Sequence, residues 1–257
     1  MIHIIVNARN SEQFINATIQ SILAQDYPDW VCWLNDDMSD DSTLDIMQQY
    51  ASQDPRFLVH STDKRHYPVG NMDRTIRFNS EIKDDDLIIE LDGDDCFARR
   101  DTITKVIQMY ASDPQLWITY GQWIGNDGTP GMAAYNPPSE LRKCKFGLSH
   151  LRSWKAFLFR AIRQEDLVDE TGWFSRAAGD YLFMVPMVEM AGDEHSRFVD
   201  EVLYVYNVGN PESEFRVVMD DVVECEKLGR SRPAYSLLER ENNEANNSVY
   251  SSVALPQ

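Results

Sequence analysis

Cysteine is scarce in this sequence, and no two cysteines are close enough to form a familiar motif. The four cysteines are far apart along the chain: Cys32, Cys96, Cys144 and Cys225. Zinc ribbons need paired Cys-x-x-Cys ligands, and small secreted scaffolds need many closely spaced cysteines. The sequence therefore argues against both classes and predicts a protein of a reduced compartment.

Basic residues are also in deficit. The 257 residues include 24 Lys and Arg against 42 Asp and Glu, so the formal net charge is −18. A protein that binds the phosphates of nucleic acid, or an anionic membrane surface, needs the opposite balance. With 43% hydrophobic and 11% aromatic residues, the chain still has enough apolar side chains to bury a core. We expect a folded, acidic protein that does not bind nucleic acid.

No apolar run reaches the length that a transmembrane helix requires. The apolar segment at residues 181–188 is short and contains Pro186. The first residues, Met-Ile-His-Ile-Ile-Val-Asn, lack the basic start and the small-residue cleavage site of a signal peptide. We therefore expect a soluble, cytoplasmic protein without a transmembrane segment.

Strand and helix patterns alternate over the first 120 residues. Short apolar runs predict five strands, at residues 2–6, 30–34, 57–60, 87–91 and 116–120. Apolar residues at helical spacing predict helices that follow Ser11 and that occupy residues 43–51, 71–79 and 102–111. This alternation is typical of an α/β fold with a mostly parallel central sheet flanked by helices. Ligands of such sheets bind at the carboxyl ends of the strands.

The pattern changes after Gly121. The composition predicts a loop at 126–138, helices at 151–162, 180–190 and 214–228, and one or two strands at 198–206. From about residue 239 the chain is rich in Asn, Ser and Glu, which is typical of a mobile tail. We divide the chain into an α/β half at 1–121, a second half of the same domain at 122–210, a helical segment at 211–238 and a flexible tail at 239–257.

Two acidic loops follow predicted strands, so the fold would place them at one edge of the sheet. In Leu-Asp-Gly-Asp-Asp, which ends at Asp95, Asp92 and Asp94 could converge on one divalent cation. Carboxylate oxygens suit Mg²⁺ or Mn²⁺. A solvated acidic turn, with Gly93 present for its backbone freedom, would explain the same residues equally well.

The second acidic loop is Asn-Asp-Asp-Met-Ser-Asp-Asp-Ser-Thr at residues 35–43. Asp40, Asp41 and Ser42 suit the N-terminus of the predicted helix. Asp36 and Asp37 lie at the strand end instead, where a carboxylate could accept a hydrogen bond from the imide N–H of a uracil.

Two further clusters have both a structural and a functional interpretation. Asp180, after Gly179, could cap the helix that follows it or remove a proton from a bound hydroxyl as a general base. His150, Arg152 and Trp154 combine aromatic faces with hydrogen-bond donors, which suits a sugar, although Trp154 could equally belong to the core.

In this order, the motifs resemble the nucleotide-binding half of family 2 glycosyltransferases of the GT-A fold. The resemblance covers about residues 1–210. Val-Asn-Ala-Arg-Asn at 6–10 is similar to the first-strand loop of that family without its Pro and Tyr, and Gly179-Asp180 is similar to a Glu-Asp motif with Gly in place of Glu. The Arg-x-His that is common in the family is replaced by Tyr-Asn-Val-Gly at 206–209, so a histidine metal ligand is not expected there.

The resemblance implies a metal-dependent, inverting transfer of a sugar from a nucleotide donor, with UDP as the nucleotide, to a hydroxyl of a glycan or other acceptor. Asp94, with Asp92, would hold Mn²⁺ or Mg²⁺, and Asp180 would be the catalytic base. Donor-binding residues would be Ala8, Arg9, Asp37, Asn71, Arg74, Asp92 and Gly93. Acceptor-side residues would be His150, Arg152 and Trp154.

Three alternatives stay open. A phosphohydrolase of the haloacid dehalogenase type also places Asp-x-Asp at a strand end, but normally on the first strand. A nucleotidyltransferase would share much of the fold, but its glycine-rich loop is absent from residues 7–11. A catalytically inactive module that keeps the fold is the third. A processive synthase is disfavoured, because neither membrane helices nor a Gln-x-x-Arg-Trp motif is present.

Overall fold

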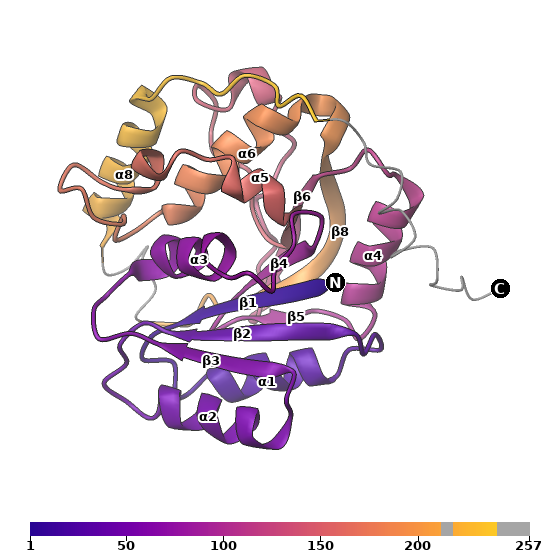
Figure 1. The fold of residues 1–257 in the computed structure, drawn as a ribbon, viewed down its shortest axis with the longest axis vertical. Helices are drawn as coiled ribbons and strands as arrows, with labels where there is room; N and C mark the ends of the chain where they lie inside the picture. Colours follow the sequence, from indigo (N-terminus) through magenta and orange to yellow (C-terminus); the bar gives the residue numbers. More distant parts are fainter. Residues whose placement is uncertain (212–217, 241–257) are drawn as a thin grey trace.

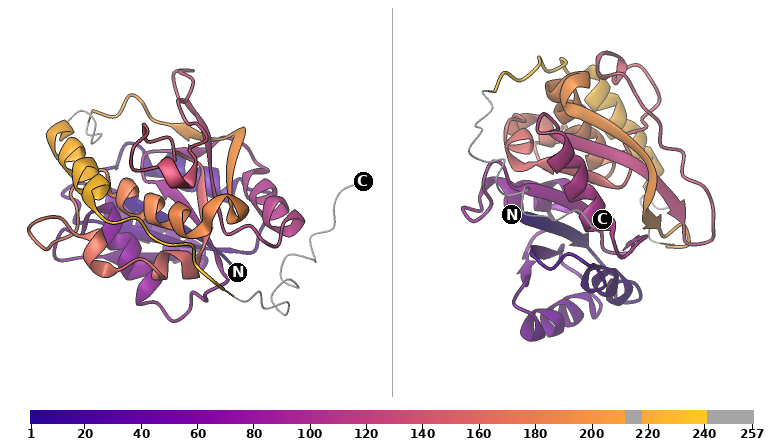
Figure 2. Two further views of the ribbon diagram at one scale, coloured as in Figure 1. Left: turned by 90° about the horizontal axis from the view of Figure 1, so that it is seen from above. Right: turned by 90° about the vertical axis from the view of Figure 1, so that its right-hand side faces the viewer.

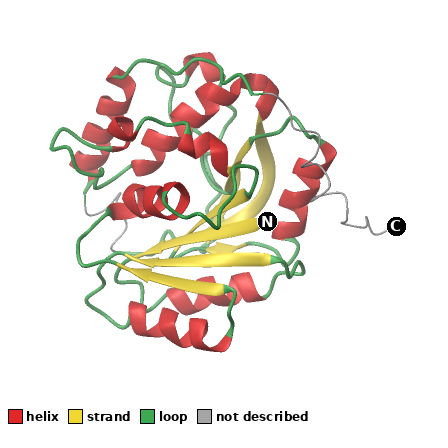
Figure 3. Ribbon diagram, in the orientation of Figure 1, coloured by secondary structure: helices red, strands yellow, loops and turns green. Residues whose placement is uncertain are grey.

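The computed structural model describes residues 1–211 and 218–240. Its centre is one eight-stranded sheet with the strand order β3-β2-β1-β4-β7-β6-β8-β5. Figure 3 shows the strands between helices on both sides, as expected from the sequence. The strands are β1 (Ile2–Ala8), β2 (Trp30–Asp36), β3 (Phe57–Ser61), β4 (Leu87–Asp92), β5 (Cys96–Phe97), β6 (Ile118–Gly125), β7 (Arg152–Lys155) and β8 (Ser196–Tyr206).

Helices cover both faces of this sheet (Figure 1). Because side chains alternate along a strand, β1 supplies Ile4 and Val6 to one core and Ile5 to the other. The first core packs α1 (Ile15–Leu23), α2 (Thr43–Gln53) and α4 (Thr102–Ser112). The second packs α3 (Tyr67–Arg77), α5 (Ala156–Arg160) and α6 (Gly179–His195). Short 3₁₀ turns lie at Pro138–Glu140 and Gln164–Leu167.

The first half of the sheet is parallel. Strand β1 pairs in parallel with β2 and β4, and β2 pairs in parallel with β3. All seven residues of β1 are buried, which explains why five of them are apolar; His3 and Asn7 are the exceptions. This topology brings the carboxyl ends of β1, β2 and β4 together.

The prediction of a helix over 151–162 is wrong in its first part. Arg152–Lys155 forms β7, which pairs antiparallel with both β4 and β6. Only Ala156–Arg160 is helical. The apolar residues of this run do not distinguish a helix from a buried strand, and pairing with β4, a distant partner in the sequence, decided the outcome.

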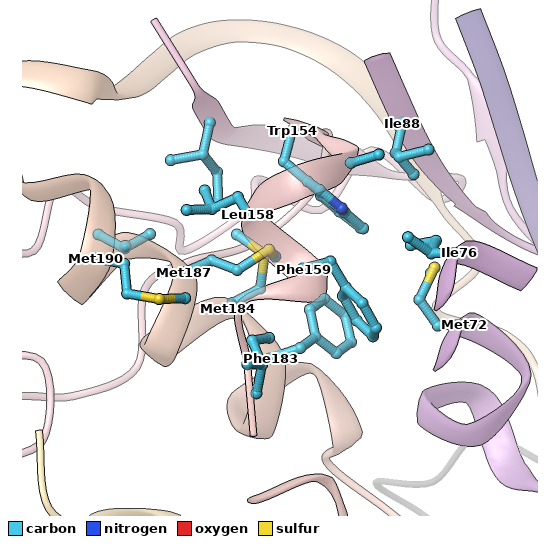
Figure 4. Close-up of a cluster of buried hydrophobic side chains, with 14 of the residues drawn as sticks. Met72, Ile76, Ile88, Trp154, Leu158, Phe159, Phe183, Met184, Met187 and Met190 are labelled. Atoms are coloured by element: carbon cyan, nitrogen blue, oxygen red, sulfur yellow. The ribbon is translucent and has the colours of Figure 1, made fainter. Parts of the chain in front are cut away.

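Trp154 is fully buried in the second core (Figure 4), near Ile88, Phe159 and Phe183. Its ring centroid lies 5.6 Å from that of Phe183. With 0% exposure, Trp154 cannot contact an acceptor, so the acceptor-side placement predicted for it does not hold.

The C-terminal part of the described chain lies over α6. Helix α8 (Met219–Ser231) packs on α6, on the side away from α1 and α2 (Figure 2). The segment after it continues across α6, where Leu238 N–H donates to Met190 O at 2.9 Å. Of the predicted helix at 214–228, residues 219–228 lie in α8; residues 212–217 and most of the predicted tail, 241–257, lie outside the described residues.

None of the helices in the described ranges combines the length and the apolar character needed to cross a bilayer.

Candidate functional site

The two acidic loops meet at the carboxyl edge of the sheet, as the predicted topology requires. The central strand β1 aligns Asn7 with both Asn35 and Asp92, and it aligns Ala8 with Asp36. One strand therefore lies between the two loops. Of the predicted donor-binding and metal-binding residues, Ala8, Asp37, Asp92, Gly93 and Asp94 share this edge, whereas Asn71 and Arg74 lie in α3.

The turn after β4 is packed directly against β1. Gly93 N–H donates to Asn7 O at 2.9 Å. A Cβ atom on Gly93 would lie 2.3 Å from the Cβ of Ala8, which real structures do not tolerate. Gly93 is thus required by close approach and not, as its sequence context suggested, by backbone freedom. This contact also accounts for the small residue at position 8.

Carboxylates crowd this turn. The Asp92 side chain is 32% exposed. Burial and the charges of Glu90, Asp95 and Asp94 raise the pKa of Asp92 well above its ordinary value. Burial also raises the pKa of Asp94, although a 2.6 Å hydrogen bond from Asn210 Nδ2 to Asp94 Oδ2 acts in the opposite direction. A bound cation would relieve this repulsion.

Asp95, which the sequence analysis did not single out, has a structural role. Tyr204 OH donates to Asp95 Oδ2 at 2.7 Å, and Asn207 N–H donates to Asp95 Oδ1 at 2.6 Å. Asp95 is 2% exposed, so both carboxylate oxygens are used inside the protein. These bonds hold the end of β8 against the acidic turn.

The donor set of the turn fits a hard divalent cation. Asp92 and Asp94 offer carboxylate oxygens, which Mg²⁺ and Mn²⁺ prefer. Within residues 1–211 and 218–240, no group of three or more His, Cys, Asp or Glu is arranged to hold a metal ion. The two carboxylates alone would leave most coordination positions to other ligands, as in sites that share the ion with substrate phosphates.

His150, predicted on the acceptor side, lies beside the acidic turn. Its Nε2 is 3.7 Å from Asp92 Oδ2, and its ring stacks on Tyr204 with centroids 4.4 Å apart. Burial and the charge of Arg152 lower the pKa of His150 well below its usual range, so the imidazole is neutral at pH 7. Its buried Nδ1 has no hydrogen-bond partner.

In the loop after β2, both carboxylate oxygens of Asp37 already accept hydrogen bonds from within the protein. Its carboxylate accepts hydrogen bonds from Arg65 Nε at 2.7 Å, His66 N–H at 2.8 Å and Tyr67 N–H at 3.1 Å. Asp36 differs: among the described residues its buried Oδ1 has no hydrogen-bond partner, and its Oδ2 accepts only the Ser39 N–H. The unsatisfied acceptor at this strand end is therefore on Asp36.

The remaining acidic residues of this loop are structural, as predicted for the start of α2. Asp41 accepts hydrogen bonds from the N–H groups of Thr43 and Glu12, both at 3.0 Å. Asp40 pairs with Arg9 at 3.1 Å. The Ser42 side chain makes no capping hydrogen bond, so Asp41 performs that function.

Two buried amide groups near this edge lack partners. Within residues 1–211 and 218–240, the Nδ2 atoms of Asn7 and Asn71 have no hydrogen-bond acceptor. Such groups are costly to bury alone, and a ligand could satisfy them. Asn71 lies in α3, which begins at Tyr67 instead of the predicted residue 71. Arg74, on the same helix, is exposed.

Asp180 lies in the first turn of α6, as predicted, with a side chain that is 29% exposed. Its Oδ2 accepts a hydrogen bond from Arg152 at 2.5 Å. A Cβ atom on Gly179 would lie 2.9 Å from the Cβ of Val69, so α3 leaves no room for a larger residue there. This contact explains why Gly precedes Asp180.

The acidic turn and Asp180 are linked through Arg152, which donates to Asp180 Oδ2 at 2.5 Å and to Glu90 Oε2 at 3.1 Å. Glu90 lies two residues before Asp92 on β4.

Burial and the negative charges of Asp95, Asp92, Asp94 and Asp180 raise the pKa of Tyr206, at the end of β8. In the sequence Tyr206 stood out only as the start of Tyr-Asn-Val-Gly, where the family commonly has Arg-x-His; the fold places its ring beside that of His150, with centroids 6.0 Å apart.

Comparison with known proteins identifies the family of this chain. Residues 3–166 match the sequence model described as "Glycosyl transferase family 2". An uncharacterised protein of Sinorhizobium fredii, y4gI, is 28% identical over 192 residues. That alignment covers 72% of this chain and 20% of the relative, so this chain spans only about a fifth of that protein.

Solved structures share the fold. TarS of S. aureus, crystallised with UDP-GlcNAc, superposes with a TM-score of 0.62 at 16% identity, covering 82% of this chain and 59% of that one. Glucosyl-3-phosphoglycerate synthase of Mycobacterium tuberculosis, crystallised with Mn²⁺, UDP and glucosyl-3-phosphoglycerate, has a TM-score of 0.62 at 15% identity, with coverages of 90% and 79%. The predicted GT-A fold is thereby confirmed.

Proposed function

Because the chain belongs to glycosyl transferase family 2, we propose that it is an inverting enzyme that moves a sugar from a UDP-sugar to a hydroxyl of a glycan or similar acceptor. Membership of this family supports a nucleotide-sugar glycosyltransferase. The donor nucleotide, the stereochemistry and the acceptor are the finer parts of the proposal. The observation that carries the proposal is that Arg152 joins Asp180 to Glu90, two residues before Asp92 on β4, which brings Asp180 close to the acidic turn.

In this proposal Asp94 and Asp92 hold Mn²⁺ or Mg²⁺ together with the diphosphate of the donor. The cation would neutralise the negative charge that develops on the departing nucleoside diphosphate. The crowded carboxylates of this turn, with the pKa of Asp92 raised, support the assignment, since a cation would replace repulsion by attraction. The M. tuberculosis neighbour was crystallised with Mn²⁺ and UDP, which also supports it.

The same edge would bind the base of the nucleotide. Uracil presents an imide N–H donor between two carbonyl acceptors. Asp36 Oδ1 is an unpartnered buried acceptor, whereas the Nδ2 atoms of Asn7 and Asn71 are unpartnered donors. We therefore extend the predicted role of Asp37 to the pair Asp36 and Asp37, with Asp36 as the acceptor of the imide hydrogen bond. Ala8 and Gly93 let the backbone approach the nucleotide, and Arg9 and Arg74 lie at its periphery.

Asp180 is the proposed general base. It would take the proton of the acceptor hydroxyl as that oxygen attacks the anomeric carbon, and the bond to the nucleotide phosphate would break on the opposite side. A single carboxylate suffices for such a one-step displacement with inversion. The 29% exposure of its side chain leaves room for a hydroxyl to approach.

We also propose that the protein works in the cytoplasm. No disulfide joins any of the four cysteines in the part of the chain that the structure describes, which suits a reduced compartment, and nucleotide sugars would be available there.

The test is a calorimetric titration of the purified protein with UDP, GDP and CDP, each with Mn²⁺ and then with EDTA. We expect UDP to bind tightly only with the metal, and GDP and CDP to bind weakly. Asp36→Asn should weaken UDP binding more than Asp37→Asn. Failure of all three nucleotides to bind, with or without Mn²⁺, would contradict the proposal and favour an inactive module.

A further inference from the structure

Arg152 lies between two carboxylates that belong to different elements. Its two terminal nitrogens donate to Glu90 Oε2 at 3.1 Å and to Asp180 Oδ2 at 2.5 Å. Its Nε donates to Leu148 O at 3.0 Å. Arg152 and Glu90 each have 4% side-chain exposure. All three nitrogens of the guanidinium group are thus used inside the protein, which leaves Arg152 unable to contact an acceptor as the sequence suggested.

The fold explains why these three side chains meet. Glu90 on β4 and Arg152 on β7 are direct cross-strand partners in the antiparallel pair. Asp180 comes from the first turn of α6. Glu90 is also two residues before Asp92 on the same strand. Arg152 therefore ties the strand that carries the acidic turn to the helix that carries Asp180.

Both oxygens of Asp180 are restrained. Arg152 holds Oδ2, and the Tyr181 N–H donates to Oδ1 at 2.9 Å. Two bonds to different oxygens fix the plane of the carboxylate. A general base must lie within hydrogen-bond reach of the proton that it removes, and a displacement of about 1 Å can cost about 100-fold in rate.

We propose that Arg152, anchored by Glu90, is a positioning residue that holds Asp180 in the orientation for proton abstraction. The inference rests on the proposed function, because it takes Asp180 as the base. Glu90 fixes the guanidinium group from the far side, so that the fork of Arg152 points toward α6. A buried ion pair is not needed for stability alone, since apolar residues of similar volume often serve as well. The proposed role requires the geometry of the fork in particular.

The test compares two lysine substitutions. Arg152→Lys keeps the positive charge but cannot bridge Glu90 and Asp180 at the same time. Arg142→Lys is the matched control, because Arg142 forms a similar buried pair with Glu189, at 2.6 and 2.8 Å, and has no bond to Asp180.

The assay measures UDP release from UDP-glucose and UDP-N-acetylglucosamine with Mn²⁺. We expect Arg152→Lys to lower kcat by about 100-fold, with KM and Mn²⁺-dependent UDP binding within about twofold. Arg142→Lys should keep kcat within about twofold.

A double-variant cycle separates positioning from general damage. If Arg152 acts through Asp180, then Arg152→Lys in an Asp180→Asn background should cause no further loss of rate. Should Arg152→Lys fail to fold, Glu90→Gln combined with Arg152→Met removes both buried charges together. We expect that protein to fold, to bind UDP with Mn²⁺ and to lose the same 100-fold in kcat.

The possible outcomes point to different errors. If Arg152→Lys retains its kcat while Asp180→Asn is inactive, the inference is wrong and the proposed function stands. If Arg152→Lys lowers the rate equally in the Asp180→Asn background, its effect is structural and the inference is again wrong. If the unchanged protein releases no UDP from either donor, or Asp180→Asn is fully active, the proposed function itself fails.

Discussion

The two ends of strand β4 carry aspartates with opposite environments. Asp86 immediately precedes the strand. It accepts hydrogen bonds from the amino group of Met1 at 2.9 Å and from the Lys83 N–H at 2.7 Å, and it lies 3.2 Å from His3 Nε2. Burial alone would raise the pKa of Asp86, but these partners outweigh it and lower the pKa to about 2.

Asp92 ends the same strand, with other carboxylates around it. Burial and the charges of Glu90, Asp95 and Asp94 raise its pKa well above the ordinary range. The protein thus supplies Asp86 with an ammonium group and N–H partners, whereas it surrounds Asp92 with negative charge. In the proposed function a bound cation would balance that charge.

The largest expected effect concerns donor binding at the carboxyl end of β4. Asp94→Ala should abolish Mn²⁺-dependent binding of the donor, because it removes half of the proposed protein ligands of the metal. Titration calorimetry with UDP and Mn²⁺ checks this, and circular dichroism should show an unchanged fold. Asp86→Asn is the matched control and should bind UDP normally. Unchanged turnover in Asp94→Ala would refute the metal site.

The second prediction concerns the carboxylate of Asp180. Asp180→Asn should lower kcat by about 1,000-fold, since a general base contributes about 10²–10⁴ to the rate and an amide cannot accept the proton. Donor affinity should stay within about twofold, because no proposed donor contact is lost. UDP release and calorimetry measure the two quantities. A fully active Asp180→Asn would remove Asp180 from the role of base.

The third prediction concerns the amino end of β4. A carboxyl with a pKa of about 2 in the folded state and about 3.9 in the unfolded state stabilises the fold by about 2.5 kcal/mol once it is ionised. Since its pKa is lowered, this contribution is complete above about pH 4 to 5 and is lost as the pH falls through 2. Asp86→Asn should therefore cost about 2 to 3 kcal/mol at pH 7, as measured by urea unfolding.

The difference in stability between the unchanged protein and Asp86→Asn should shrink as the pH is lowered from 5 to 2. A difference that does not depend on pH would show that the charge of Asp86 is not its source.

The smallest effect is expected for Asp92→Asn. Unlike Asp86→Asn, this substitution should raise the free energy of unfolding. A raised pKa means that ionisation of Asp92 destabilises the folded state, and this penalty is complete above the folded-state pKa. Asp92→Asn should therefore stabilise the metal-free protein at pH 7, by about 1 kcal/mol on the scale of such substitutions. Thermal unfolding in EDTA measures this. Added Mn²⁺ should stabilise the unchanged protein but not Asp92→Asn; equal stabilisation of both would argue against a metal ligand at this position.

Much of the first half of the fold could be predicted from local sequence patterns. Strands β1, β2, β3 and β4 and helices α1, α2 and α4 lie where periodicity placed them, within a few residues. Placing both acidic loops at one edge required only the rule that parallel strands share a direction. The start of α3 was missed because its first turn contains Pro68, and residues 67–70 carry little apolar periodicity.

The second half shows the limit of such patterns. Arg152 and Trp154 had the composition of a sugar-binding cluster, yet one lies in a buried ionic bridge and the other in the core. The residues next to them in the sequence give no indication of Glu90. Glu90 is 62 residues from Arg152 in the chain and lies directly opposite it on the neighbouring strand. Cross-strand contacts of this kind arise only when the sheet is complete.

The class of fold, the acidic turn at the end of a buried strand and the position of Asp180 at the start of a helix could all be predicted without the structure. These features depend on period, spacing and residue type, which are local properties. The tertiary structure alone decided which carboxylates have partners: Asp37, Asp86 and Asp95 are satisfied within the protein, whereas Asp36 keeps an unpartnered oxygen and Asp92 faces other negative charges. Partners come from distant segments, and only the packed chain brings them within the few ångströms over which hydrogen bonds act.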